Sequence, residues 1–311
     1  MDGAVCIGGA VLDRKYRAHA PIVPRTSNPA DGLRGFGGVA RNVAENLARL
    51  GTRAGLVSIV GDDDTGRAML AALHQAGVDV SRVITSTAKA TAEYVAILSP
   101  ENDLALGIAD MGIFDLFTPD HLDRLWPYLD AAEWVLADCN LPHETLGRLI
   151  SRARRNGFKL AIDAVSTLKA ARLPDDLSGV DLLFMNLDEA NALRGPHFAD
   201  GRDAALALQA TGAREAVVTL GAGGLALASI DGAFPFPAIQ ADVIDITGAG
   251  DALIAGTLHG LLRGRDTRAA IRTGMLLATL TTETAASVHP DLSASLLQAN
   301  MHRIALEGHL A

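Results

Sequence analysis

Short apolar runs alternate with amphipathic stretches along most of the chain. Helix periodicity is clearest over 39–50, where four apolar residues share one face and Gly51 supplies a stop signal. A second helix is predicted over 66–75, and the final third, from Ala249 to about Leu306, is mostly helical in pattern. The apolar runs predict buried strands at 4–12, 54–60, 134–140, 159–165, 181–186 and 216–221, with short strands at 224–229 and around Val243.

This alternation predicts an α/β fold. Strand–helix–strand units form right-handed crossovers, so we expect a mainly parallel sheet with helices on both faces. The expected architecture is a three-layer α/β/α sandwich in a single domain over 1–311. Ligands of such sheets bind beyond the carboxyl ends of the strands. Candidate chemistry is therefore expected where strands end.

Two stretches, 14–36 and 88–110, break the alternation. Both are strand-like, with period-2 hints around Tyr94, and a helical crossover fits neither. We interpret them as strands of a small second sheet that forms a lid over the pocket. Sheet edges and apolar side chains outside the main core favour pairing, so we expect a homodimer in which two lids pack together.

Composition narrows the function classes. Apolar residues make up 49% of the 311 and charged residues 20%, as in ordinary globular proteins. The net charge of −9 argues against a nucleic-acid polymer as partner, because an acidic surface repels phosphate backbones. No run approaches the ~18 unbroken apolar residues of a membrane helix, and the glycine-broken start is typical of a first strand, not a signal peptide. Cys6 and Cys139 lie far apart, which suits a reducing cytoplasm, and the nine histidines form no metal-binding pattern.

The strongest chemical signal is DITGAGDA at 245–252, after the strand predicted around Val243. Gly248 and Gly250 let consecutive N–H groups converge at the positive end of the helix that follows, which makes an anion site. Asp251 falls in the first turn beside that site. A carboxylate there suits a general base that takes a proton from an attacking hydroxyl, and an unperturbed Asp is already ionised at neutral pH.

The octet resembles the C-terminal signature of the ribokinase-like (PfkB) family, D-T-x-G-A-G-D, and GGVARNVA at 37–44 resembles its N-terminal signature. The resemblance covers essentially the whole chain. It implies a kinase that moves the γ-phosphate of ATP to a hydroxyl of a sugar or nucleoside. Asp251 would be its base, and the anion hole would comprise Gly248, Ala249 and Gly250.

The resemblance also implies where the acceptor binds. Asp13, at the end of the first predicted strand, matches the family's sugar-binding Asp, whose carboxylate can accept two hydroxyls. Gly38 would let substrate approach the backbone, and Asn42 would hydrogen-bond a sugar hydroxyl from the following helix.

Two shorter motifs match motifs that the ribokinase-like family uses to bind the nucleotide. Asn186 and Glu189 fit the family's N-x-x-E, which implies Asn186 near the phosphates and Glu189 on Mg²⁺ through water. Taken alone, this motif is equally typical of helix capping. TLGAGG at 219–224 resembles a loop that lies against the phosphates. The further residues implied on this side are Thr219, Gly221, Gly224 and Thr247.

Two acidic segments of the sequence are candidates for binding a cation. The family often uses a monovalent cation beside the anion hole, and Asp245 with the backbone near Thr247 matches half of such a site, so K⁺ is a further candidate ligand. The other half is expected from about 284–293. The three carboxylates at 62–64 precede a helix, so capping is preferred there to metal binding.

Four smaller features are Asn28 in the first lid stretch, Arg41 where ribokinases usually have a small residue, Asp110 with Met111 at the end of the second lid stretch, and Asn140 at the end of a central strand. Together they resemble a subgroup that phosphorylates the 5′-hydroxyl of pseudouridine, a C-nucleoside. Such a substrate needs polar groups for both ribose and base. His289 and Gly112 differ from the residues that the subgroup has at these positions. These differences affect the expected specificity for the nucleobase. The implied substrate-binding residues, besides those already named, are Asn28, Asp110 and Asn140.

Two alternatives stay open. One is a kinase of the same family with another acceptor, such as ribose, adenosine or a ketose. The other is a non-catalytic nucleotide- or sugar-binding regulator on the same fold, which requires a lost base or a lost anion hole. A Rossmann dehydrogenase is poorly supported, because Gly8 and Gly9 do not belong to a full G-x-G-x-x-G.

Overall fold

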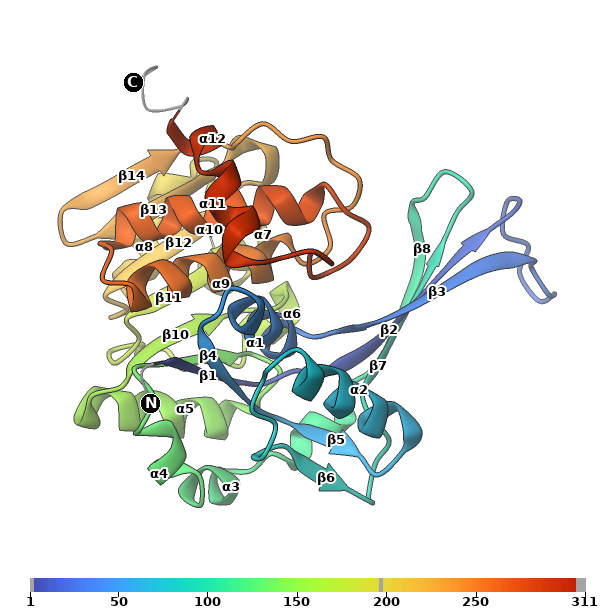
Figure 1. Ribbon diagram of the computed structural model, residues 1–311, viewed down its shortest axis with the longest axis horizontal. Coiled ribbons are helices and arrows are strands. Elements are labelled where there is room, and N and C mark those ends of the chain that lie inside the picture. The colour runs from blue at the N-terminus through green and yellow to red at the C-terminus, as the bar shows by residue number, and fades with distance from the viewer. Residues whose placement is uncertain (1–2, 196–197, 306–311) are drawn as a thin grey trace.

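The computed structural model describes residues 3–195 and 198–305, and its largest element is an eight-stranded sheet (Figure 1). From edge to edge the strands run β14-β13-β12-β11-β10-β9-β1-β4. The strands from β12 to β4 are all parallel, whereas β13 and β14 add an antiparallel edge. Their bounds are β1 Gly3–Ile7, β4 Arg53–Val57, β9 Trp134–Asp138, β10 Lys159–Asp163, β11 Leu182–Asn186, β12 Glu215–Thr219, β13 Leu225–Ser229 and β14 Gly232–Phe236.

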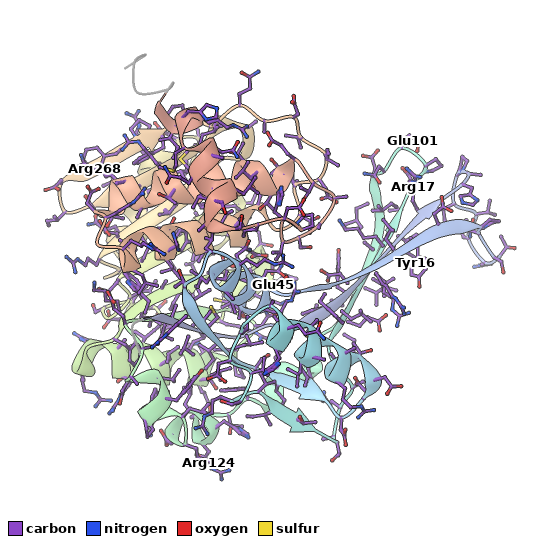
Figure 2. All side chains as sticks on the ribbon, viewed as in Figure 1. Tyr16, Arg17, Glu45, Glu101, Arg124 and Arg268 are labelled. Carbon is purple, nitrogen blue, oxygen red and sulfur yellow. The ribbon has the colours of Figure 1, made fainter. Side chains whose placement is uncertain are left out.

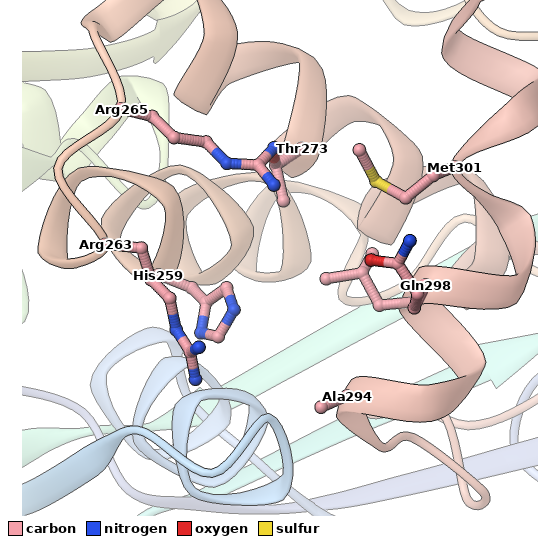
Figure 3. A pocket seen from close by; sticks show the side chains of 8 residues that line it. His259, Arg263, Arg265, Thr273, Ala294, Gln298 and Met301 are labelled. Atoms are coloured by element: carbon pink, nitrogen blue, oxygen red, sulfur yellow. The ribbon is translucent and has the colours of Figure 1, made fainter.

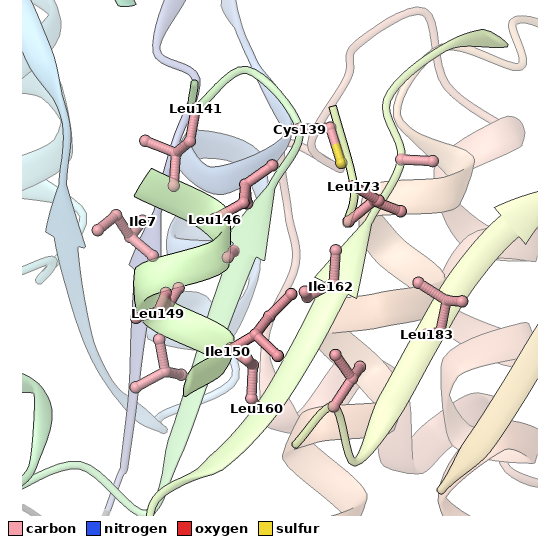
Figure 4. Close-up of a cluster of buried hydrophobic side chains, with 14 of the residues drawn as sticks. Ile7, Cys139, Leu141, Leu146, Leu149, Ile150, Leu160, Ile162, Leu173 and Leu183 are labelled. Carbon is pink, nitrogen blue, oxygen red and sulfur yellow. The ribbon is translucent and has the colours of Figure 1, made fainter. Parts of the chain in front are cut away.

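Helices cover both faces of this sheet. They are α1 Val39–Arg49, α2 Asp64–Gln75, η1 Gly112–Leu116, α3 Pro119–Asp123, α4 Trp126–Leu129, α5 His143–Asn156, α6 Thr167–Ala170, α7 Leu187–Arg194, α8 Gly201–Gln209, η2 Gly221–Gly223, α9 Ala249–Leu262, α10 Thr267–Thr282, α11 Ala294–Asn300 and α12 His302–Ala305. Successive strand residues point to opposite faces. Ile7 joins a core cluster with α5 and α8, as Figure 4 shows in part, whereas Cys6 joins another with α1, α9 and α10. The three-layer sandwich predicted from the alternation is confirmed.

Four strands form a second sheet, named here the lid sheet. Its order is β3-β2-β7-β8, with β2 at Val11–Ala18, β3 at Ala30–Gly37, β7 at Glu93–Leu98 and β8 at Leu104–Asp110. The stretches expected to form it do so, and it projects away from the main sheet, with Tyr16 and Arg17 on it (Figures 1 and 2). A third, two-stranded sheet pairs β5 (Ile59–Gly61) with β6 (Ile84–Ser86).

The strand predicted over 4–12 is broken in two. β1 ends at Ile7 and β2 begins at Val11, because the chain turns between them. In that turn the Gly9 N–H donates to the Asp138 carboxylate at 2.8 Å, not to a neighbouring strand. The break carries the chain from the main sheet into the lid sheet.

The strand predicted around Val243 is wrong. No strand occurs over 237–248, and β14 at 232–236 holds the sheet edge instead. Val243 and Ile244 are 61% and 65% exposed, so burial does not favour a strand there. The N–H groups of Ile244 and Asp245 both donate to the Thr282 carbonyl, at 2.8 and 3.2 Å. This anchors the segment to the end of α10 as a loop that leads into α9.

Candidate active site

Asp251 lies in the first turn of α9 and faces α1. Its Oδ2 accepts a 2.6 Å hydrogen bond from the Asn42 Nδ2. Two residues predicted separately from the two ends of the chain, one for the acceptor and one for catalysis, are therefore in direct contact.

The anion site predicted from the sequence would lie at the N-terminus of α9. Its N-cap is Gly248, in the left-handed region with φ 82°, and a Cβ there would overlap the Ser287 carbonyl, so only glycine fits. A Cβ on Gly250 would meet no atom within 4 Å, which leaves open space above the first turn. N–H groups of a first helical turn have no intrahelical acceptor. The position therefore suits a phosphoryl group.

The protonation of Asp251 differs from the sequence expectation of an ordinary, fully ionised carboxylate. Removal from water raises its pKa to about 7. The Asn42 amide opposes the rise, and the carboxylates of Asp138 and Asp13 add to it. A general base works best with a pKa near the operating pH, so this environment favours proton transfer by Asp251.

Arg41 determines how Asn42 is oriented. The buried guanidinium donates from Nη1 to the Asn42 Oδ1 at 2.6 Å and to the Phe36 carbonyl at 2.9 Å. An amide whose oxygen accepts from Arg41 must present its NH₂ group to Asp251. Glu45 pairs with the same guanidinium, and Arg49 pairs with Glu45. The sequence did not predict Arg41 as a site residue.

Asp13 lies near the start of β2, where the chain enters the lid sheet. A Cβ on Gly37 of the neighbouring strand would overlap the Asp13 carboxyl, so the glycine makes room for it. Burial raises the pKa of Asp13 to about 6, while the positive charges of Lys15 and Arg41 lower it. The carboxyl lies close enough to Asp251 to raise that residue's pKa as well.

Asp138 organises the loops around these groups. It is fully buried at the end of β9, and its oxygens accept from the backbone N–H groups of Gly9 (2.8 Å), Ala40 (3.0 Å) and Asn140 (2.9 Å). Since Ala40 lies in the first turn of α1, Asp138 caps that helix from 98 positions away. This long-range cap replaces a local one, because the N-cap residue Gly38 has no side chain.

Gly38 is required for the close packing of two loops. Its φ is 96°, and a Cβ would overlap the Gly9 carbonyl. The backbone of another loop therefore packs against Gly38 on the side where a Cβ would lie. Asn140 Oδ1 accepts from the Lys169 Nζ, and its amide nitrogen lies against Gly9, so it belongs to the same group of loops.

Asn186 and Glu189 form a capping box at the start of α7. Glu189 N–H donates to Asn186 Oδ1, and Asn186 N–H donates to Glu189 Oε2, both at 2.8 Å. Glu189 is buried, and burial raises its pKa. Asp163, at the end of β10, has a pKa raised well above its usual value by burial and by the charges of Glu189 and Asp251. Carboxyl groups thus gather below the anion site, although no described cluster of three has metal-binding geometry.

The predicted nucleotide-side residues meet at one edge. Asn186 and Thr219 are register partners at the carboxyl ends of β11 and β12. The loop after Thr219 contains Gly221 and Gly224, both with positive φ, and the Leu220 N–H closes it onto the Gly224 carbonyl at 2.8 Å. Thr247 lies one residue before the N-cap of α9, where its N–H and hydroxyl donate to Asp245 Oδ1 at 2.8 and 2.6 Å.

This geometry agrees with the comparison to known proteins. The model of the pfkB family carbohydrate kinases matches residues 1–293. The chain belongs to the PfkB family of carbohydrate kinases. It is 30% identical over 296 residues to the pseudouridine kinase of Escherichia coli (strain K12), with 94% of each chain covered. A solved carbohydrate kinase from Agrobacterium tumefaciens is 33% identical, with a TM-score of 0.82 over 97% of both chains. Ribokinase from Thermotoga maritima has a TM-score of 0.85 at 19% identity, over 96% of this chain and 99% of that one.

As a PfkB kinase, the chain is a phosphotransferase that acts on a hydroxyl group. The fold is that of ribokinase. No helix among the described residues is long and apolar enough to span a membrane.

One polar residue proposed for the acceptor, Asn28, stands apart from this PfkB site. Asn28 is exposed between β2 and β3, where its carboxamide bonds Val23 and Thr26 and closes the loop. From Asp13 to the end of β2 is about 17 Å at strand rise, so the structure does not bring Asn28 to Asp251. Asp110, also proposed for the acceptor, is exposed at the end of β8, where Glu93 is its register partner. Thr91, just before β7, hydrogen-bonds the Asp63 carboxylate.

The interpretation of the acidic segment at 62–64 is confirmed. Asp63 is the N-cap of α2 and accepts from the Gly66 N–H at 2.8 Å. Cys6 and Cys139 are both buried, and burial raises the pKa of each thiol, as expected for inert cysteines.

A cavity of about 130 Å³ lies farther along α9 (Figure 3). His259, in its wall, is eight residues beyond Asp251, about 12 Å along the helix. Burial lowers the pKa of His259 to about 4, and its Nδ1 pairs with the Thr52 hydroxyl at 2.7 Å. None of the residues that line the cavity is one of the site residues described above, so the cavity lies outside the candidate active site.

Proposed function

We propose that this kinase transfers the γ-phosphoryl group of ATP to the 5′-hydroxyl of pseudouridine, giving pseudouridine 5′-phosphate and ADP. The observation that carries the chemistry is the contact between Asn42 and Asp251 at the open N-terminus of α9. We treat 1–311 as one ribokinase-like domain with the lid sheet as part of it.

Asp251 acts as the general base in this proposal. Asp251 belongs to the same first turn of α9 as the N–H groups of the anion hole, so an acceptor hydroxyl near Asp251 would also lie near a phosphoryl group held there. Asp251 takes the hydroxyl proton as the new O–P bond forms, and the N–H groups from Gly248 to Gly250 stabilise charge on the phosphoryl oxygens. A pKa of about 7 keeps much of Asp251 ionised at neutral pH.

ATP would supply the phosphoryl group, with its phosphates between the α9 N-terminus and the loop at 219–224. Mg²⁺ would neutralise phosphate charge, held through water by Glu189. This fits the residues present, because only Oε2 of Glu189 serves the capping box and the neighbouring Asp163 adds negative charge that a cation offsets. Asn186 would lie near the phosphates.

The acceptor site combines groups from three elements. Asp13 from β2 would accept hydrogen bonds from ribose hydroxyls. Asn42 from α1 would contact the sugar next to the general base Asp251. Asn140, after β9, and Asp110, at the end of β8, are proposed for the uracil ring. The similarity to the Escherichia coli pseudouridine kinase supports this acceptor over others in the family.

Turnover on a panel of nucleosides and sugars with ATP and Mg²⁺ tests the proposal. Pseudouridine should exceed free ribose by at least ~10³ in kcat/KM, about 4 kcal/mol, because a site built to bond particular groups rejects analogues that lack them. Uridine carries the same ribose, so the ratio of kcat/KM for pseudouridine to kcat/KM for uridine measures how strongly the enzyme recognises the nucleobase. Equal efficiency on ribose or adenosine would leave only the family-level activity.

A further inference from the structure

A lysine from the lid sheet reaches the loop that leads into the anion hole. Lys15 Nζ donates to Asp245 Oδ2 at 2.7 Å and to the Thr247 hydroxyl at 2.9 Å. Lys15 belongs to β2, whereas Asp245 and Thr247 precede α9, so the ion pair joins segments 230 positions apart. Both charged side chains are about one-third exposed or less, at 32% and 27%.

These contacts use both oxygens of the Asp245 carboxylate. Oδ1 accepts from the Thr247 N–H and hydroxyl, and Oδ2 accepts from Lys15. Burial by itself raises the pKa of Asp245, but the hydrogen bonds from Lys15 and Thr247 outweigh it and hold the pKa below its usual value. The carboxylate therefore already has a positively charged partner.

The position of this ion pair matters for catalysis. Thr247 is followed directly by Gly248, the N-cap that shapes the anion hole. On β2, Lys15 is two residues from Asp13, so both side chains point to the same face of the lid sheet. The ammonium thus lies beside the loop that would hold the phosphoryl group, on the same strand that carries the acceptor's carboxylate ligand.

The monovalent cation expected at Asp245 does not fit this arrangement. A K⁺ ion on the same carboxylate would lie beside the Lys15 ammonium, and two like charges at one site repel each other. An ammonium group carries the same charge as K⁺ and differs little from it in size, so it can neutralise Asp245 and order the loop in the same way.

We infer that the Lys15 ammonium takes the place of a monovalent cation beside the anion hole, so that this kinase works without K⁺. Lys15 is then a positioning residue that acts through Asp245 and Thr247 on the first turn of α9. Because Lys15 comes from the lid sheet, its contacts also tie this loop to the lid sheet. This inference rests on the proposed phosphoryl transfer.

The test compares the wild type with Lys15→Met in KCl and in tetramethylammonium chloride of equal ionic strength. Wild-type kcat and Tm should agree within about twofold and one degree between the two salts, since no ion is bound. Without K⁺, the kcat of Lys15→Met should fall roughly tenfold or more (about 1.4 kcal/mol), whereas its KM for the acceptor should change less. Addition of K⁺ or NH₄⁺ should restore both the activity and the Tm of this variant. Arg17→Ala is the matched control, because Arg17 lies on the same face of β2 but pairs with Asp31 inside the lid sheet.

Three results would overturn the inference. The first is several-fold activation of the wild type by K⁺. The second is full activity of Lys15→Met without K⁺. The third is a loss in Lys15→Met that no cation restores, which would mean that Lys15 contacts the phosphoryl group itself. Absence of turnover on every acceptor would instead contradict the proposed function, and the Tm comparison would still report whether K⁺ binds only when Lys15 is removed.

Discussion

Asn42 and Asp251 lie 209 positions apart in the chain, yet the Asn42 amide donates to the Asp251 carboxylate at 2.6 Å. The contact joins the first turn of α1 to the first turn of α9. Arg41 holds the amide in the orientation that makes this possible. The pair therefore links a residue proposed to bind the acceptor to the pKa of the proposed general base.

Asn42→Ala should shift the pH dependence of activity. The Asn42 hydrogen bond favours the ionised form of Asp251, so its loss raises the pKa of Asp251 above about 7. A base must be deprotonated to act, so the acidic limb of the kcat/KM profile should move to higher pH. Asn46→Ala, one turn along the same helix and bonded to the Asn42 carbonyl, should leave the limb in place. An unchanged or lowered limb in Asn42→Ala would contradict the role of the contact.

Asp251→Asn should separate catalysis from binding. The amide has nearly the same shape but accepts no proton at neutral pH, so kcat should fall by roughly 10²–10⁴. ATP affinity, measured by calorimetry, should stay near the wild-type value. The acidic limb near pH 7 should also disappear from any residual activity. Weak ATP binding combined with near-normal turnover would exclude Asp251 as the base.

Glu189→Gln tests the Mg²⁺ proposal without disturbing α7. A glutamine oxygen can still accept from the Asn186 N–H, so the capping box and the Tm should persist. The lost charge weakens the hold on the metal–water shell, so the Mg²⁺ concentration for half-maximal activity should rise more than the KM for acceptor. A titration that coincides with the wild type would remove Glu189 from the metal site.

Asp13→Ala tests the acceptor's sugar contacts. The Asp13 carboxylate is proposed to bond ribose hydroxyls that pseudouridine and free ribose share. The substitution should therefore lower kcat/KM on both by a similar factor and leave their ratio unchanged. Asn140→Ala should instead lower the ratio of kcat/KM for pseudouridine to kcat/KM for ribose, because Asn140 is proposed to contact the uracil ring. If Asp13→Ala changed this ratio and Asn140→Ala did not, the proposed roles of the two residues would have to be exchanged.

The lid sheet is expected to mediate a homodimer. Tyr16 pairs with Ile97, and Ile97 with Leu106, in the strand register, so these apolar side chains share the face opposite Asp13. Leu106 and Ile108 are each 53% exposed. A lid-to-lid contact would cover this face.

Light scattering of the wild type at micromolar concentration should give the mass of two chains, and Ile108→Lys should give one. Leu168→Lys, at a leucine that is 87% exposed outside the lid sheet, should remain dimeric. A monomeric wild type would refute the dimer. A dimeric Ile108→Lys would place the interface elsewhere.

Local pattern was sufficient for the parts of this protein that depend on neighbours in the chain. The period of apolar residues predicted the sandwich and the second sheet, because each element buries the face that its own sequence makes apolar. The octet at 245–252 correctly predicted a glycine-led helix start with Asp251 in its first turn, since the glycines and the apolar residues that follow them lie next to each other in the chain.

Tertiary structure decided the features that depend on segments far apart in the chain. The strand expected around Val243 is a loop because Thr282, on another helix, takes its N–H groups. The cap of α1 comes from Asp138, and the cation beside Asp245 comes from Lys15. No local pattern marks these contacts, because each partner by itself is an ordinary polar residue. The raised pKa of Asp251 has the same origin: a charge is disfavoured by the sum of its surroundings, and those surroundings exist only once the chain has folded.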